Sequence, residues 1–170
     1  MSEIMTVLGP IAPEELGFTS MHEHVLYDGH CFRRRFGHLI PPDPPVKVDE
    51  PVTLENLGML KHGFIMSDDA LLMRDVELLS AELADFKAEG GSAVVDMSTP
   101  GMRVDPLGTR KVSEQSGVHI VITTGFYSRD SWPESFLEMG LAEMEAHMMQ
   151  EVEKGLEGTD VRPGHVKIAI

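Results

Sequence analysis

From residue 67 onward, apolar positions recur with the spacing of a helix face. They are separated by four, three, four and three residues, which places them on one side of an α-helix; they are Leu72, Val76, Leu79, Leu83 and Phe86. Ser67 is a suitable N-cap, and Gly90-Gly91 ends the pattern. The sequence therefore predicts a helix between Ser67 and Gly90.

Strand-like and helical stretches alternate after this helix. The short apolar runs SAVVDM (92–97), VHIVITT (118–124) and HVKIAI (165–170) are typical of buried strands. Asp105-Pro106 has the signature of a helix start, and Gly117 closes that helix. Ser131 and Glu134 have capping-box spacing, which predicts a helix from Ser131 whose apolar face comprises Leu137, Leu141, Met144, Met148 and Val152.

The first 66 residues are less regular. TVLGPI (6–11) and GFTSM (17–21) read as two short extended segments joined by a turn at Pro13. The stretch 27–66 contains clustered prolines, the basic run Arg33 to Arg35, and neither a helical nor a strand period. A stretch of this length inside a compact domain is a functional loop or a disordered linker. We expect a loop, because Phe32, Phe36, Leu39, Ile40 and Leu57 can anchor it.

The order strand, long loop, helix, strand, helix, strand, helix, strand indicates right-handed βαβ units and a parallel sheet. Four such strands fit either a small open sheet or half of a closed barrel. HVKIAI ends the sequence without a covering helix, and a full barrel needs roughly 250 residues. We therefore expect an α/β fold in which residues 1–170 form the first four strands of a (β/α)8 TIM barrel.

The composition limits the kinds of molecule that this protein is expected to bind. The 170 residues carry 14 basic and 28 acidic side chains, a formal net charge of −14, which disfavours nucleic acid and anionic lipid. Cys31 is the single cysteine, and the N-terminus lacks the charge and apolar pattern of a signal peptide. We expect a cytoplasmic protein with no nucleic-acid or membrane partner.

The clearest local indication of a functional site is the segment Met21-His22-Glu23-His24. In a strand, His22 and His24 project to the same side, because side chains alternate. Two imidazoles at one strand end can bind a divalent cation. Surface or core histidines are the alternative, but active sites of barrels collect at the strand ends that this pair would occupy.

Lys167 lies in the last predicted strand between Val166 and Ile168. Burial would lower the pKa of its amine, and the neutral amine can combine with carbon dioxide to give a carbamate that bridges two metals. A solvated lysine on an edge strand is the alternative.

The sequence resembles the phosphotriesterase family of the amidohydrolase superfamily, which includes phosphotriesterase-like lactonases and phosphotriesterase-related proteins, as an N-terminal half. The segments that carry the resemblance are TVLGPI, LGFTSMHEH, VTLEN, ELADFKAEGGSAVVD, SGVHIVITTGFY and GLEGTDVRPGHVKIAI. It implies that His22 and His24 bind the more buried of two divalent metals, with zinc expected. It also implies that Lys167 is carboxylated, bridges both metals and serves as a catalytic residue. Further ligands, two histidines and an aspartate, would come from strands five, six and eight.

The expected roles of other polar residues come from their positions and from the resemblance. Tyr127, just beyond the third strand, is a substrate-contact residue or a packed loop tyrosine; we expect contact with substrate. Asp96 ends the second strand, where it caps or supports the site. Arg103 and Asp105 resemble a family Gly-x-Arg-Asp segment with Val104 inserted, so we assign Asp105 to the helix N-cap and no site role to Arg103.

The resemblance implies a hydrolase in which a metal-bridging hydroxide attacks a small-molecule substrate. We expect a lactone or carboxyl ester first and a phosphotriester second. The alternative is a catalytically incomplete half-barrel that acts as a binding or self-associating fragment. Because a half-barrel exposes sheet edges, we also expect a homo-oligomer or pairing with the missing barrel half.

Overall fold

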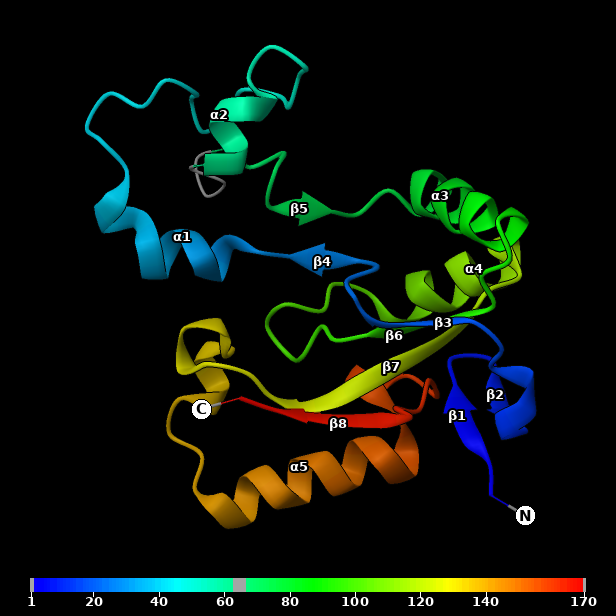
Figure 1. Ribbon diagram of the computed structural model, residues 1–170. Helices are drawn as coiled ribbons and strands as arrows, with labels where there is room; N and C mark the ends of the chain where they lie inside the picture. The colour runs from blue at the N-terminus through cyan, green and yellow to red at the C-terminus, as the bar shows by residue number, and fades with distance from the viewer. Residues whose placement is uncertain (1, 63–66, 170) are drawn as a thin grey trace.

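The computed structural model describes residues 2–62 and 67–169. Its centre is a curved parallel sheet of four strands in the order β3 (Thr19–Glu23), β6 (Ala93–Asp96), β7 (His119–Phe126) and β8 (His165–Ile168) (Figure 1). Neighbouring strands pair in the order in which they occur along the chain, as expected for successive βα units. The predicted parallel sheet is confirmed; Ile170, the last residue of the expected strand, lies outside the described residues.

Three helices connect and cover these strands: α3 (Val76–Ala88), α4 (Pro106–Ser116) and α5 (Leu141–Lys154). Strand residues Val94, Ile120 and Ile122 share one core with Val112 of α4, and α3 packs against the same core. These strand positions are an even number of residues apart within each strand, so they lie on the helix-facing side.

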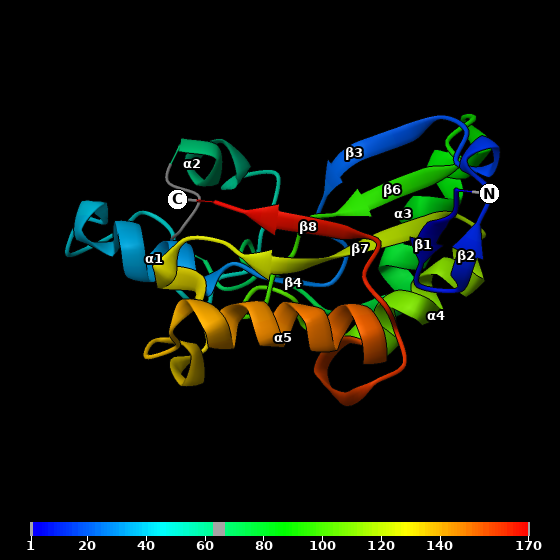
Figure 2. The ribbon, with the colours of Figure 1, turned by 90° about the horizontal axis from the view of Figure 1, so that it is seen from below.

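The two ends of the sheet carry different structures. The hairpin of β1 (Ile4–Thr6) and β2 (Gly9–Ile11) lies at the amino ends of the strands, where Val7 N–H donates to Ile120 O at 2.9 Å. The segment after β3 lies beyond their carboxyl ends in both views (Figure 2). TVLGPI is thus a tight hairpin rather than one extended segment.

The stretch 27–66 is more regular than expected. Its described part contains β4 (Tyr27–Asp28), α1 (His30–Phe36), a 3₁₀ turn (Gly37–Leu39) and α2 (Leu57–His62); residues 63–66 lie outside the described residues. The helices are too short to show a period in the sequence. They place the stretch over the carboxyl ends of the strands, and its role as a functional loop stays a prediction.

Ion pairs fix α1 in place. His30 Nδ1 lies 2.6 Å from Asp28 Oδ1, and its Nε2 lies 3.0 Å from Asp68 Oδ1. Arg33 also pairs with Asp68.

The next two arginines contact Asp130. Arg34 donates to Asp130 O at 3.0 Å, and Arg35 lies 3.7 Å from the Asp130 carboxylate. The basic run is therefore engaged in structural contacts, and His30 has a structural role.

The first predicted helix begins later than expected. Ser67 is not its N-cap: the Ser67 hydroxyl donates to Glu50 O at 2.5 Å, and Leu72 lies in β5 (Leu72–Met73), paired with β4. The helix starts at Val76, where the Asp75 carboxylate accepts the Leu78 N–H at 3.0 Å. The apolar period continued through a strand residue, so periodicity alone misplaced the boundary.

Asp75→Ala is expected to lower the free energy of unfolding by about 1 kcal/mol, because it removes the N-cap acceptor of α3. Urea denaturation followed by circular dichroism measures the change. Asp85→Ala, at an exposed position inside the same helix, is the control and should change stability by less than about 0.5 kcal/mol. Equal losses in both variants would contradict the assignment of Asp75 as the cap.

The last helix also begins later than expected. Two 3₁₀ turns, Arg129–Ser131 and Glu134–Phe136, precede α5, which starts at Leu141, where Gly140 N–H donates to Glu143 Oε2 at 2.8 Å. The helix after Asp105 begins at Pro106 as predicted, although the Asp105 side chain makes no capping hydrogen bond.

Within the described residues, no helix is both long enough and apolar enough to span a membrane.

Candidate functional site

The two histidines of the HxH motif lie side by side at the carboxyl end of β3. Their ring centroids are 5.5 Å apart, and the pairing of β3 with β6 is irregular between Ser20 and Glu23. His22 is exposed, whereas His24 is half-buried. The structure thus brings the two imidazoles together, as the alternation of side chains predicts.

Burial and nearby positive charge keep the His24 imidazole neutral. Burial is the main reason that its pKa is lowered to about 4, and the charge of Lys167 lowers it further. A neutral imidazole is the form that binds a metal ion. His24 therefore has the protonation state that a metal ligand needs at neutral pH.

Lys167 reaches the same end of the sheet from β8. Its Nζ lies 3.3 Å from Met97 O and 4.6 Å from the centroid of the Tyr127 ring. Burial lowers the pKa of the amine, and the carboxylate of Asp96 opposes that shift. A larger fraction of the amine is consequently neutral at a given pH than for a lysine in water.

The side chains present fit part of a metal site. Among residues 2–62 and 67–169, no group of three or more histidine, cysteine, aspartate or glutamate side chains is placed to hold a metal ion. His22 and His24 supply two imidazole nitrogens, and Lys167 supplies an amine whose lowered pKa favours carbamate formation. This set can hold one side of a metal centre and needs further ligands to complete it.

Two tyrosines flank these residues. The Tyr127 ring faces Lys167, and Trp132 Nε1 donates to Tyr127 O at 2.7 Å, which ties Trp132 to the backbone at Tyr127. The Tyr27 ring lies 4.7 Å from that of His24, and burial raises the pKa of the Tyr27 hydroxyl. Sequence reasoning missed Tyr27 because it falls in a stretch without a recognisable period; its position three residues after His24 is the available signal.

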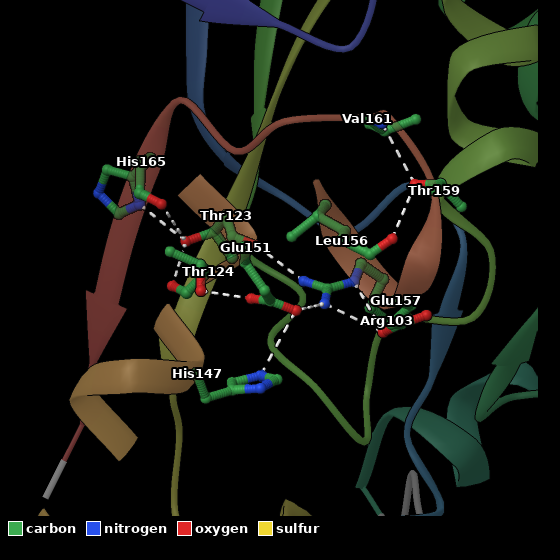
Figure 3. Close-up of polar contacts among 10 residues, drawn as sticks. All are labelled: Arg103, Thr123, Thr124, His147, Glu151, Leu156, Glu157, Thr159, Val161 and His165. Atoms are coloured by element: carbon green, nitrogen blue, oxygen red, sulfur yellow. Dashed lines mark hydrogen bonds and ion pairs between the residues drawn. The ribbon is translucent and has the colours of Figure 1, made fainter. Parts of the chain in front are cut away.

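A buried ion-pair network lies against β7, the strand that pairs with the strand of Lys167 (Figure 3). Arg103 Nη2 lies 2.9 Å from Glu151 Oε1, and its Nη1 donates to Thr123 O on β7 at 2.7 Å. The side chains of Arg103 and Glu151 are 0% and 3% exposed. We expected no site role for Arg103, and the contacts described here give it a structural one, as a buried cation paired with Glu151.

The same network reaches the β7–β8 pair. Thr124 donates to Glu151 Oε2, and Thr123 Oγ1 lies 3.0 Å from His165 Nδ1, two residues before Lys167. Arg103 Nε also donates to Glu157 Oε1 at 3.1 Å. Glu157 has a φ of 52°, the only positive φ at a non-glycine position in the described part of the chain. The network ties α5, the loop after it and β7 into one unit behind Lys167.

The sequence profile of the Phosphotriesterase family matches residues 2–170. The N-acetyltaurine hydrolase of Xenopus tropicalis is 31% identical over 164 residues, which cover 95% of this chain and 46% of that protein. The chain thus spans about half the length of the curated relatives it matches.

Solved structures agree in fold. A resiniferatoxin-binding protein from Rhodobacter sphaeroides has a TM-score of 0.87 and 30% identity, over 99% of this chain and 46% of that one. A lactonase from Listeria monocytogenes has a TM-score of 0.65 and 26% identity, over 98% of this chain and 47% of that one. The described chain therefore corresponds to half of a (β/α)8 barrel, which confirms the predicted fold class.

Proposed function

Because this chain belongs to the phosphotriesterase family, we propose that it supplies the first half of the active site of a metal-dependent hydrolase. One observation carries the proposal: the HxH pair of β3 and Lys167 of β8 meet at the carboxyl end of the sheet, close enough for the lysine charge to lower the pKa of His24. These strands are the two outermost of the four. Active sites of (β/α)8 barrels form at this end.

Within this proposal, His22, His24 and Lys167 hold two divalent cations, with zinc as the proposed metal. When bound, such cations polarise a carbonyl or phosphoryl oxygen and activate water. The neutral Lys167 amine forms an N–C bond to carbon dioxide and loses one proton, which leaves an anionic carbamate with two oxygen ligands. The lowered pKa of Lys167 supports this step, because only the neutral amine carries the lone pair that attacks.

We propose a substrate with a carbonyl centre, that is an amide, a lactone or a carboxyl ester, ahead of a phosphotriester. Relatives are named N-acetyltaurine hydrolase and lactonase, and both names denote hydrolysis at a carbonyl carbon. Tyr127 and Tyr27 would line the pocket beside Lys167 and His24. Turnover of N-acetyltaurine, a lactone and a phosphotriester by the whole protein, compared at equal concentration, tests this order.

Lys167→Ala is expected to reduce bound metal from about two ions per protein to one or fewer, and turnover by roughly 100-fold or more, because it removes the bridging ligand. Elemental analysis of protein prepared without chelator measures the metal content. Lys154→Ala, at an exposed position at the end of α5, is the control and should match the unmodified protein. Unchanged metal content and turnover in Lys167→Ala would contradict the proposed site.

A further inference from the structure

A surface hollow beside the candidate site is lined by two arginines and a tryptophan. Its volume is about 570 Å³, and its lining includes Arg34 of α1 together with Arg129 and Trp132 from the segment after β7. Trp132 Nε1 donates to Tyr127 O at 2.7 Å, and the Tyr127 ring centroid lies 4.6 Å from Lys167 Nζ. The hollow is therefore connected to the candidate site through Tyr127.

Two loops in close contact form one wall of the hollow. Gly101, in the loop between β6 and α4, has a φ of 87°, and a Cβ there would lie 1.9 Å from Ser131 O, so this approach requires glycine. The Arg129 guanidinium lies over the Trp132 ring, 5.8 Å from its centroid, and its Nη2 donates to Leu137 O at 2.7 Å. Stacking and a backbone hydrogen bond thus orient Arg129 before any ligand binds.

Neither arginine of the hollow has a carboxylate partner in the part of the chain that the structure describes. Arg34 Nη2 donates to Asp130 O at 3.0 Å, so Arg34, like Arg129, is hydrogen-bonded there to a backbone carbonyl alone. Such a bond uses one of the five N–H groups of a guanidinium and leaves the charge unbalanced. The remaining N–H groups are free to bind a ligand that carries the opposite charge.

Two carboxylates also line the hollow, and their charges are balanced to different extents. The Asp130 carboxylate lies 3.7 Å from Arg35 Nε, which offsets its charge. Glu134 is exposed and forms no ion pair within residues 2–62 and 67–169. With Arg34 and Arg129 both unbalanced against this one carboxylate, the hollow stays net positive, in a chain whose formal net charge is −14.

We propose that this hollow binds the anionic end of a small-molecule substrate, while the bond to be hydrolysed lies beside His24 and Lys167. Guanidinium groups present planar, parallel donors that match the oxygens of carboxylate and phosphate groups, and a sulfonate offers similar oxygens. Among carbonyl substrates, the hollow thus selects those with an anionic terminus. Anion binding is independent of the proposed function; only the role of the anion as part of a substrate rests on it.

The first arm of the test measures binding of ethanesulfonate by fluorescence. Trp132 is the single tryptophan of these 170 residues, so its emission reports on the hollow directly. In Arg129→Gln we expect a Kd about 10-fold higher, because a hydrogen bond between charged groups is lost; Arg129→Lys, which keeps the charge, should lose less. Glu134→Gln should bind about 2–5-fold more tightly, because it removes a charge that repels the anion.

The second arm compares turnover of N-acetyltaurine with that of N-ethylacetamide by the whole protein. The two amides differ only in the sulfonate, so the ratio of their kcat/KM values measures recognition of the anionic end. We expect N-acetyltaurine to be preferred, and the ratio to fall about 10-fold in Arg129→Gln. Lys154→Gln is the matched control: it removes one positive charge at an exposed position at the end of α5 and should change neither readout.

The outcomes separate the proposal from the proposed function. Failure of the unmodified protein to bind ethanesulfonate, or Arg129→Gln behaving like Lys154→Gln, would overturn the proposal. Equal kcat/KM values for the two amides would show that the hollow binds free anions rather than substrate, and would also overturn it. Ethanesulfonate binding with the expected variant pattern, but without turnover of either amide, would contradict the proposed function while supporting the anion site.

Discussion

Arg103→Met is expected to lower the free energy of unfolding by about 3–5 kcal/mol. The substitution keeps much of the side-chain volume but leaves the Glu151 carboxylate buried without its counter-charge, and such a loss costs this much in other buried pairs. It also removes the donor to Thr123 O. The expected effect is a large part of the total stability of a small domain, and chemical denaturation measures it.

A second substitution separates loss of charge balance from loss of packing. In Arg103→Met/Glu151→Gln the unpaired charge is gone while an acceptor for Thr124 remains, so we expect more than half of the lost stability to return. Arg162→Met is the control, because Arg162 is exposed although it also donates to a backbone carbonyl, Val152 O at 2.8 Å. Losses that simply add in the double variant would show that the two residues are not coupled.

Gly125→Ala is expected to cost roughly 2–6 kcal/mol and to displace Lys167. Gly125 has a φ of 114°, and a Cβ there would lie 2.0 Å from Lys167 O on the paired strand. The backbone conformation costs about 1–3 kcal/mol for a residue other than glycine, and overpacking costs about 1–3 kcal/mol more. Since β8 must move to accommodate the methyl group, the position of the Lys167 amine changes with it.

Gly90→Ala isolates the conformational part of this cost. Gly90 has a φ of 98°, but a Cβ there has nothing within 4 Å. We expect it to destabilise the chain by about 1–3 kcal/mol, less than Gly125→Ala, and to leave metal content unchanged. Urea denaturation and elemental analysis of both variants make the comparison; equal stability and equal metal content would refute the close approach of β7 and β8 at Lys167.

The parallel sheet was predictable because its strands are short apolar runs between capped helices. The predicted strands 92–97 and 118–124 correspond to β6 and β7 with each end within two residues, and Gly117 adopts the left-handed conformation expected after a helix. In these segments local propensity and tertiary packing favour the same structure, so the sequence pattern was sufficient.

Helix starts were less predictable, because more than one residue near each start could cap. Ser67 is a good N-cap by type, but its hydroxyl binds Glu50 O, seventeen residues earlier in the chain. Asp75 caps instead, since the chain between them is used for the β4–β5 pair. Which capping residue is used depends on contacts distant in sequence, and these contacts leave no local signal.

The residues of the candidate site also include some that the sequence indicated and some that it did not. The spacing of the HxH pair drew attention to it, but the assignment of His22, His24 and Lys167 together depended on the resemblance to the phosphotriesterase family, because a lysine in an apolar strand is also explained as a solvated edge residue. Tyr27 was not singled out, because it acts through proximity to His24 rather than through a motif. The structural role of Arg103 was not predictable from the sequence, because it depends on burial, and the partners that neutralise it, Glu151 and Glu157, are about fifty residues away.

The left-handed backbone at Glu157 has a consequence for anyone redesigning this fold. Rules that idealise a backbone would place glycine at every position with positive φ, and here that change would relieve about 1–2 kcal/mol of strain. It would also delete one of the two carboxylates that contact the Arg103 guanidinium. Replacing Glu157 with glycine would therefore remove strain from the loop but leave the buried Arg103 cation with one carboxylate fewer. The strained residue contributes to the neutralisation of a buried charge.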